Sequence, residues 1–565
     1  MRVVIGLAVL AALLLGGLWW RATWVADHLL HSEAPKSIAE KSGNVYRLAV
    51  GRVRFNPFRR RIVVDSIRLT TNDAINMQRP RPRTALRLAF NQCTIAGMHL
   101  FTLIAGRGLV AASFGCATVS AVAEMPPGRG SPDTVATPGP AHPAPQTFFI
   151  LQQGLRLPSF APRIQVARID FPHASLDFRL QRTRGEAARL ALEHLEWRMT
   201  DFAVDPADSE ATSRPLFSRT VDISAANFVA QPESGAAVRV EAFAASLPDS
   251  TVEVRGVTYV PTISDSAFGR SSPYRRALVK TTVGRIAVRG FDVGAFVLNG
   301  DVRAERVLVD SLGVDVLSDR RRPPNPRRPS RRTPQKWIAD LGRSVSVDSV
   351  VIRSGEVVYR EQRARHPKPG VLTFARLDGV AVNVRHVAGG RRTGSPMTLR
   401  ATAYLQGAGG GRLDTRFVVP LDAPSFDMSF NGSLGPMPAA TLNAFIQETF
   451  ALRLDKGRVL GIDFAASVAN GLAQGAIVPR YKDLSIEVTG RGAKGILGTG
   501  GVVGEAARDI ASLVGNETKL RADNPDDGQT TPRRGPINHT FTPNETLPAF
   551  LWISLRGGLM AVVRK

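Results

Sequence analysis

Arg61-Ile-Val-Val-Asp-Ser-Ile-Arg-Leu69 alternates between polar and apolar side chains over most of its length. Alternation with period two is typical of a strand that buries one face of a sheet and exposes the other. The pattern returns along much of the chain, and a polar or glycine step inside several copies indicates a bulge or a tight turn. Further copies are Arg163–Phe171, Val252–Val260, Arg285–Val293, Arg306–Val314, Val345–Ile352 and Phe374–Val384.

These copies predict a mainly β protein with roughly twenty to twenty-five strands of ordinary length. Placed side by side at about 4.8 Å, so many strands would make a sheet on the order of 100–120 Å wide, which must twist or curl. We therefore expect a long twisted or curled antiparallel sheet that forms a groove, with an N-terminal transmembrane helix and a few amphipathic helices near the C-terminus.

Helical spacing of apolar residues is confined to three late stretches, 442–450, 503–514 and 550–562. The last of these ends in Arg564 and Lys565. We expect it to cover the end of a sheet, and the alternative is a helix that lies on a membrane surface.

Composition limits the class of protein. The chain has 565 residues, of which 44% are hydrophobic and 21% charged, enough apolar mass for large buried cores. The formal net charge of +25 reflects either the coding bias of a GC-rich genome or attraction to an anionic surface. We expect no nucleic acid partner, because the sequence contains no zinc-finger, RRM or KH signature.

The N-terminus has the character of a membrane anchor. An uncharged run occupies residues 3–20 and ends beside Trp19, Trp20 and Trp24. As a helix, about 18 residues rise roughly 27 Å, close to the thickness of a bilayer core. A cleaved signal peptide is the alternative, but Leu-Trp-Trp-Arg is a poor cleavage site. We expect residues 1–22 to form the single span and the rest of the chain to be exported.

Proline-rich and polar interruptions divide the remaining chain. Such segments bury too little surface to offset their ordering entropy, so we interpret 125–147, 319–336 and 521–536 as linkers or mobile loops. The expected segments are a first β segment at 23–124, a linker at 125–147, a second β segment at 148–318, a basic Pro/Arg-rich loop at 319–336, a C-terminal β region at 337–495 and a helical tail with a mobile segment at 496–565.

The sequence contains no recognisable catalytic motif. The nine histidines include no pair at i, i+4 spacing, and Gly-x-Ser-x-Gly is missing. The glycines of Gly498–Gly504 do not fit a nucleotide-binding loop. We therefore predict no catalytic, cofactor-binding or metal-ligating residues and no enzymatic activity. Cys93 and Cys116 either pair in an oxidising compartment or remain two small buried thiols, and the sequence leaves both open.

Three stretches resemble the AsmA-like family of bacterial envelope proteins, which belongs to the superfamily of repeating β-groove, bridge-like lipid transfer proteins. Tyr46–Phe55 followed by Arg61–Leu69 is similar to the opening strand pair of that family. Val345–Tyr359 resembles its recurring hairpin of apolar strand, glycine and apolar strand, and Arg168–Phe178 is a weaker copy. Lys456–Phe464 through Gly475–Val488 looks like its C-terminal region.

The resemblance implies a protein anchored once in the bacterial inner membrane, with its body in the periplasm and a role in phospholipid transport, outer-membrane lipid homeostasis or envelope biogenesis. A phospholipid or another membrane lipid is the expected partner, and envelope proteins are possible further partners. The alternative is an envelope scaffold or assembly factor that binds proteins through the edges of its sheet.

An apolar sheet face can hold acyl chains by buried area alone. The side chains expected to line such a face include three that alternation would place together on one strand, Val380, Val382 and Val384. The other interpretation of these side chains is an ordinary packed core. The remaining candidates are Val307, Val309 and Ile352.

Overall fold

The computed structural model shows a mainly β protein whose twenty-one strands belong to one mixed sheet that is not closed. The chain divides into two compact units, residues 1–139, 143–256 and 289–300 in unit 1 and residues 140–142, 257–288 and 301–565 in unit 2. The structure describes residues 28, 31–32, 34–56, 58–78, 85–99, 101–102, 105–125, 162–180, 188–205, 207–208, 210, 214–231, 236–261, 263–268, 273–299, 301–323, 333–341, 343–363, 368–387, 394–450, 452–488, 521–542 and 545–564.

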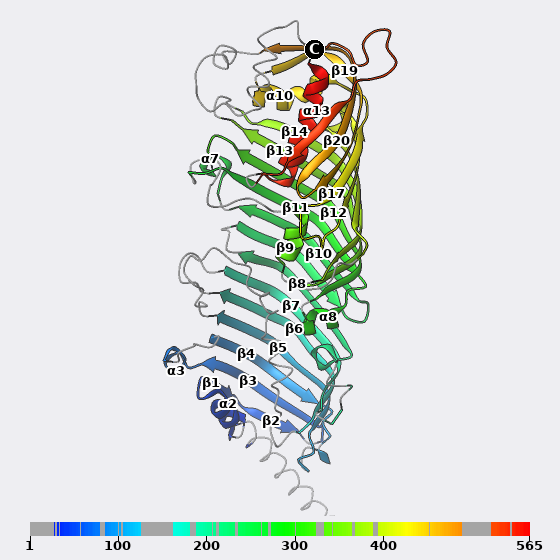
Figure 1. Ribbon diagram of the computed structural model, residues 1–565. Helices are drawn as coiled ribbons and strands as arrows, with labels where there is room; N and C mark the ends of the chain where they lie inside the picture. Colours follow the sequence, from blue (N-terminus) through cyan, green and yellow to red (C-terminus); the bar gives the residue numbers. More distant parts are fainter. Residues whose placement is uncertain are drawn as a thin grey trace, which may run out of the picture. The chain divides into compact units, whose positions relative to one another are not determined.

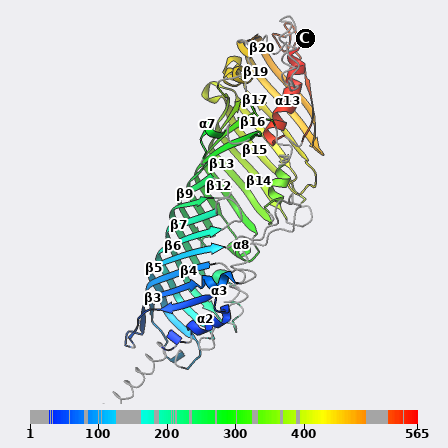
Figure 2. The ribbon, with the colours of Figure 1, turned by 90° about the vertical axis from the view of Figure 1, so that its left-hand side faces the viewer.

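In unit 1 the strands follow one another across the sheet in chain order (Figure 2). At its edge, β1 and β2 pair with opposite halves of β3. The strands are β1 (Tyr46–Val50), β2 (Val53–Asn56), β3 (Arg61–Thr71), β4 (Ala85–Ala96), β5 (Leu109–Met125), β6 (Ile164–Leu180), β7 (Ala188–Val204), β8 (Thr220–Gln231), β9 (Ala236–Ser246) and the first half of β10 (Thr251–Pro261). The short helices are α2 (Ala34–Ser42), α3 (Asp73–Met77), η2 (Pro215–Phe217) and α8 (Val293–Asn299).

Unit 2 contains the remaining described strands and helices (Figure 1). Its strands are β11 (Arg276–Arg289), β12 (Val302–Asp319), β13 (Val345–Gln362), β14 (Gly370–His386), β15 (Met397–Leu405), β16 (Arg412–Val419), β17 (Met428–Leu434), β18 (Met437–Pro438), β19 (Leu452–Ala469), β20 (Leu472–Val488) and β21 (Gly535–Thr540). Its helices are α7 (Asp265–Phe268), α9 (Pro334–Ala339), η3 (Gly407–Gly409), η4 (Ala439–Leu442), α10 (Asn443–Phe450) and α13 (Leu547–Val563).

The expectation of a purely antiparallel sheet is wrong at two places, because β5 pairs with β6 and β12 with β13 in parallel. A parallel neighbour must start at the same end of the sheet, so the chain has to return along the full strand, which takes a dozen residues or more. The chain between β5 and β6 contains the proline-rich interruption at 125–147, and the chain between β12 and β13 contains most of the one at 319–336.

The hairpin expected over Val345–Tyr359 is also wrong. These residues belong to the single strand β13, whose register against β14 shifts between Ile352 and Gly355. Ser354 at this point has a positive φ of 52°. The polar step therefore marks a bulge and not a tight turn, the two structures that such a step allows. The bulge accommodates one extra residue without reversing the direction of the chain.

Skipped ladder pairs align in rows across neighbouring strands, and the alternation of side chains reverses at two such rows, here called break rows. The first break row is Asp65, Gln92 and Ala117, and the second is Glu305, Asp348 and Asn383. Ladder pairs occur on both sides of each row and not at it. Gln92 and Asn383 have left-handed φ values of 50° and 58°. Since each strand carries its irregular residue at the same level, the register is unchanged across the row.

Helix α13 lies on β20 and β21 and fills the core at the C-terminal end of unit 2 (Figures 1 and 2). Its Phe550 is fully buried and packs edge-on against Phe426 and Phe541. A Cβ on Gly535 would come closer than van der Waals contact to the carbonyl oxygen of Gly558, so the helix approaches β21 backbone to backbone. The helix predicted at 550–562 is confirmed and covers the sheet, and α10 confirms the one at 442–450. The predicted 503–514 helix lies outside the described residues.

The polar segment 521–536 is a structured loop, which corrects its interpretation as a mobile linker. Asn524 is fully buried, and its backbone exchanges hydrogen bonds with Tyr481 of β20. Its side-chain oxygen accepts a hydrogen bond from the Arg533 amide at 2.8 Å. The loop is therefore fixed to the sheet by backbone pairing that its polar composition does not reveal.

The predicted anchor, residues 1–22, lies outside the described residues, as does most of the linker at 125–147. Among the residues that the structure describes, no helix is long and apolar enough to span a membrane. The transmembrane span therefore stays a prediction from the sequence.

Cys93 and Cys116 form a disulfide between directly opposed positions of β4 and β5, with Cα atoms 3.9 Å apart. Both side chains are buried, at 1% and 3% exposure, in a cluster with Ile62, Val64 and Met98. The bond closes a loop with a sequence separation of 23 residues. The sequence left open a disulfide or two buried thiols, and the structure has the disulfide.

Replacing both cysteines, as in Cys93→Ala with Cys116→Ala, should lower the free energy of unfolding of unit 1 by about 3 kcal/mol, since the cross-link no longer restricts the unfolded chain. Chemical denaturation with and without a thiol reductant measures the effect. Reductant should shift the wild-type curve toward that of the double variant and leave the variant unchanged; a wild-type curve insensitive to reductant would contradict the role assigned to the bond.

Candidate functional site

One face of unit 1 carries a continuous set of apolar side chains, here called the apolar face of β3–β6. On a regular strand, residues three positions apart point to opposite faces. Phe90 and Cys93 of β4 are three positions apart and still belong to one cluster, because the first break row reverses the alternation between them. Phe171 joins the strands, with its ring centroid 6.4 Å from Phe90 and 5.6 Å from Phe114. Its residues are Val50, Val53, Phe55, Ile62, Val64, Ile67, Phe90, Cys93, Ile95, Met98, Leu109, Ala111, Phe114, Cys116, Val119 and Phe171.

The apolar surface continues beyond β6. Phe114 and Phe171 also pack against a second cluster whose buried members are Val166, Ile169, Met199 and Val221, so the surface extends to β8. Of the first cluster, every residue except Met98 lies on a strand. Strands therefore build most of the described apolar surface of unit 1, with Leu216 of η2 packed against its second cluster, whereas α13 packs on β20 and β21 in unit 2.

The opposite side of these strands is charged. Arg168 and Arg198 form ion pairs with Asp170 at 3.1 and 3.5 Å. Arg168 and Asp170 flank the apolar Ile169 on β6, and Arg198 precedes the apolar Met199 on β7. Neighbouring residues on a strand point to opposite faces, so the charges are directed away from the aromatic side chains. The sheet thus has a charged face and an apolar face.

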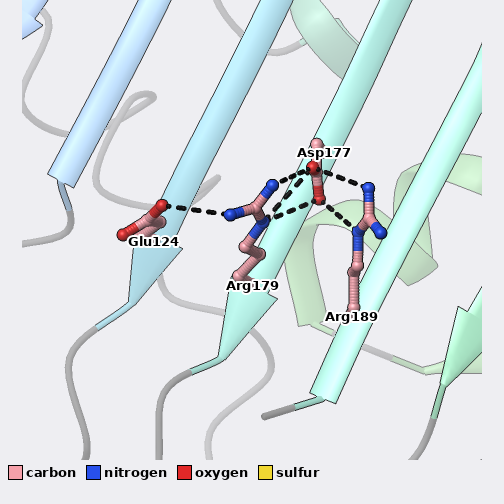
Figure 3. A network of polar contacts seen from close by, with 4 residues as sticks. All are labelled: Glu124, Asp177, Arg179 and Arg189. Carbon is pink, nitrogen blue, oxygen red and sulfur yellow. Dashed lines mark hydrogen bonds and ion pairs between the residues drawn. The ribbon is translucent and has the colours of Figure 1, made fainter.

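Figure 3 shows a polar network at the ends of β5, β6 and β7. Arg179 and Arg189 lie opposite each other in the β6–β7 ladder, an arrangement that like charges disfavour. Asp177 offsets it by accepting hydrogen bonds from Arg179 at 2.7 Å and Arg189 at 3.0 Å, while Glu124 lies 3.6 Å from Arg179. Hydrogen bonding to Arg179 and then to Arg189 lowers the pKa of Asp177 to about 2.

Because this pKa is depressed, Asp177 stabilises the fold above the unfolded pKa near 3.8, and the contribution is lost as the pH falls through about 2. Asp177→Asn should cost about 1 kcal/mol of unfolding free energy at neutral pH, the scale of a partly exposed ion pair. Urea titrations at several pH values test this. The difference between wild type and variant should shrink at acid pH, and a constant difference would rule out the ionic origin.

Unit 2 contains a hollow of about 560 Å³, whose lining residues include Asp378, Val380, Arg400, Asp414 and Arg416. Its floor is one rung of the ladder, in which Gly379, Ala401, Thr415, Gly432 and Phe464 are successive partners from β14 to β19. Paired positions share a face, and Phe464 packs against the main core cluster, so this rung faces the core side. The small residues leave the space that larger side chains fill elsewhere.

The predicted lining residues divide between the two faces. Val307 and Val384 pack against the main core cluster, and Val309 pairs with Ile352, both half-buried. Val380 and Val382 are 43% and 37% exposed. Val380 follows Gly379 of the core-side rung, so it points away from the core. Val380, Val382 and Val384 therefore do not share one face, and lipid contact by any of the six stays a prediction.

Asn383 is the reason for the error. Its left-handed backbone places an irregular residue between Val382 and Val384, and the alternation reverses there. Asn is among the few residues that adopt this conformation at low cost, because its short side chain can hydrogen-bond locally. A polar residue between two valines in a strand was the only sign of the break in the sequence.

Asn383→Val should destabilise unit 2 by about 1–2 kcal/mol, because a β-branched residue is strained at positive φ, whereas Asn383→Gly should be close to neutral. Thermal or urea unfolding of the two variants measures the difference. Equal stability of the Val and Gly variants would show that the backbone at this position is not left-handed.

The ends of β12 and β13 carry an excess of arginine around two buried acids. Glu361 is 3% exposed and accepts hydrogen bonds from Arg363 at 2.7 Å and from the Tyr359 hydroxyl at 2.9 Å, while Arg320 lies 3.0 Å from it. Asp319 is also buried and accepts a hydrogen bond from Arg321 at 2.7 Å. Burial and the charge of Arg320 lower the pKa of the nearby Arg275. Four guanidinium groups thus accompany two carboxylates, which leaves this rim of unit 2 positive.

The described residues contain no group of three or more His, Cys, Asp or Glu side chains placed to hold a metal ion. No protein-family model and no curated protein matches the sequence. The chemistry on which a function can be argued is therefore the separation of an apolar face from charged rims.

Proposed function

We propose that this protein is an envelope protein that shelters phospholipid acyl chains on the apolar side of its sheet, anchored in the bacterial inner membrane with its body in the periplasm. The observation that carries the proposal is the apolar face of β3–β6, of whose residues all but Met98 lie on strands. Its role would be the transport or balance of phospholipid between membranes.

The dimensions and energetics support an acyl chain as the occupant. Strands β5 and β6 have 17 residues each, a length of about 55 Å at 3.3 Å per residue. Each buried methylene contributes about 0.8 kcal/mol, so contact along such a face holds a two-tailed lipid without a specific pocket. The flat side chains of Phe90, Phe114 and Phe171 provide much of this contact area.

Charge supports a phospholipid in particular. The formal net charge is +25, and arginine binds phosphate through paired N–H donors, so phospholipid headgroups are favoured partners of this chain.

The disulfide supports an exported body. Bonds such as that between Cys93 and Cys116 persist in oxidising compartments and are rare where glutathione keeps thiols reduced. This agrees with a periplasmic location.

The scaffold alternative receives less support from the sheet edges. In the described strands, β1 and β2 pair with β3 alone and are only 5 and 4 residues long. The edge carries exposed Arg47 and Arg54, and short, charged edges discourage strand addition. At β21 the packed helix α13 restricts access.

Photo-crosslinking in cells tests the proposal. A benzoylphenylalanine at position 90 or 114 replaces one aromatic side chain by another on the apolar face of β3–β6. The matched controls are positions 87 and 118, exposed residues on the same two strands. Adducts identified by mass spectrometry should be phospholipids at 90 and 114 and should be missing at 87 and 118.

Two outcomes would contradict the proposal. Protein adducts at 90 and 114 in place of lipid would indicate that the face is an interface for a partner chain. Equal lipid labelling at all four positions would indicate general proximity to a membrane and no selective binding by the apolar face.

A further inference from the structure

Two neighbouring loops of unit 1 expose phenylalanine almost completely. Phe58, in the β2–β3 turn, is 88% exposed, and Phe101, in the β4–β5 loop, is 90% exposed. Large aromatic side chains are ordinarily buried, and a pair of them presented to solvent marks a surface with a partner. This observation is independent of the apolar face of β3–β6.

The two loops lie at the same edge of the sheet, here meaning the side at which β3 begins and β4 ends. Arg61 at the start of β3 pairs with Ala96 at the end of β4, and the Met98 amide donates a hydrogen bond to the Arg60 carbonyl at 3.2 Å. The edge is distinct from the one that carries α3, which connects the other ends of β3 and β4.

Hydrogen bonds inside both loops fix their conformation. The Asn56 side chain accepts from the Arg59 amide at 3.0 Å, and the Ala105 amide donates to the Phe101 carbonyl at 3.0 Å. The Thr102 hydroxyl donates to the His99 carbonyl at 2.7 Å. The exposed rings are therefore held at the tips of structured loops.

The surroundings of the two rings are basic. Arg59, Arg60 and Arg61 follow Phe58, Arg107 ends the second loop, and neither 57–60 nor 97–108 contains an acidic residue. Arg59 and Arg60 are themselves exposed. An aromatic ring with adjacent arginines suits the interface of an anionic bilayer, where the ring enters the boundary of the acyl chains and the guanidinium groups meet phosphate.

We propose that this edge of unit 1 docks on an anionic lipid surface, with Phe58 and Phe101 inserted at the headgroup level and Arg59, Arg60 and Arg107 on the phosphates. The contact gives unit 1 a second attachment to a membrane besides any N-terminal span. Charge complementarity selects the lipid surface over a water-facing protein partner, since a purely apolar protein pocket offers nothing to the arginines.

Fluorescence in vesicles tests the docking. The full-length protein carries an NBD fluorophore on Phe58→Cys or Phe101→Cys, and both native cysteines remain paired in the disulfide. Met77→Cys provides the matched control, because Met77 in α3 is also a solvent-exposed apolar residue, at 78%, but lies on the other edge. The proteins are reconstituted in vesicles of phosphatidylglycerol and phosphatidylcholine in equal parts.

Labels at 58 and 101 should shift to shorter emission wavelength and be quenched by nitroxide-bearing lipid, while the label at 77 should behave as in water. Vesicles of phosphatidylcholine alone, or the combined variant Arg59→Gln with Arg60→Gln, should lose most of the shift. Water-like emission at 58 and 101 overturns the proposal, and so does an equal shift at 77. An unchanged emission shift in vesicles of phosphatidylcholine alone would contradict the proposed binding of the arginines to anionic headgroups.

Discussion

Where an irregular residue interrupts a strand, the alternation of faces reverses, so the apolar side chains stay on one face only if the sequence pattern shifts at the same point. The two break rows meet this constraint in both units. Val64 and Ile67, or Ala304 and Val307, lie three positions apart and still pack in one cluster each. Because neighbouring strands carry the irregular residue at the same level, the ladder keeps its register and the apolar face stays continuous. The proposal that the sheet shelters acyl chains depends on that continuity.

The crossovers follow from the same sheet. Antiparallel neighbours need only turns, but the parallel pairs β5–β6 and β12–β13 require the chain to travel back along a full strand. Proline-rich segments suit such returns, since they span distance without demanding strand partners of their own. The composition that separates these segments from the β regions is thus part of the sheet's topology.

The two units use their apolar side differently. In unit 2, α13 and Ile338 of α9 complete a filled core around Phe426 and Phe430. In unit 1, most described residues of the clusters that contain Phe90, Phe114 and Phe171 lie on strands. A filled core supports stability, whereas a face of aromatic and aliphatic side chains without such a cover can accept chains from a lipid. Charged side chains such as Arg168, Asp170 and Arg198 lie on the opposite face of these strands.

The sequence by itself determined the mainly β class, the approximate number of strands, two of the late helices and the positions of the long connections, because all of these depend on local periodicity and composition. Tertiary structure decided which strands run parallel, that Cys93 and Cys116 face each other, and that Val382 and Val384 lie on opposite faces. Pairing brings together residues that are distant in sequence, and a single left-handed residue such as Asn383 reverses every side chain beyond it. Neither effect changes the local pattern enough to be seen before the strands are placed beside one another.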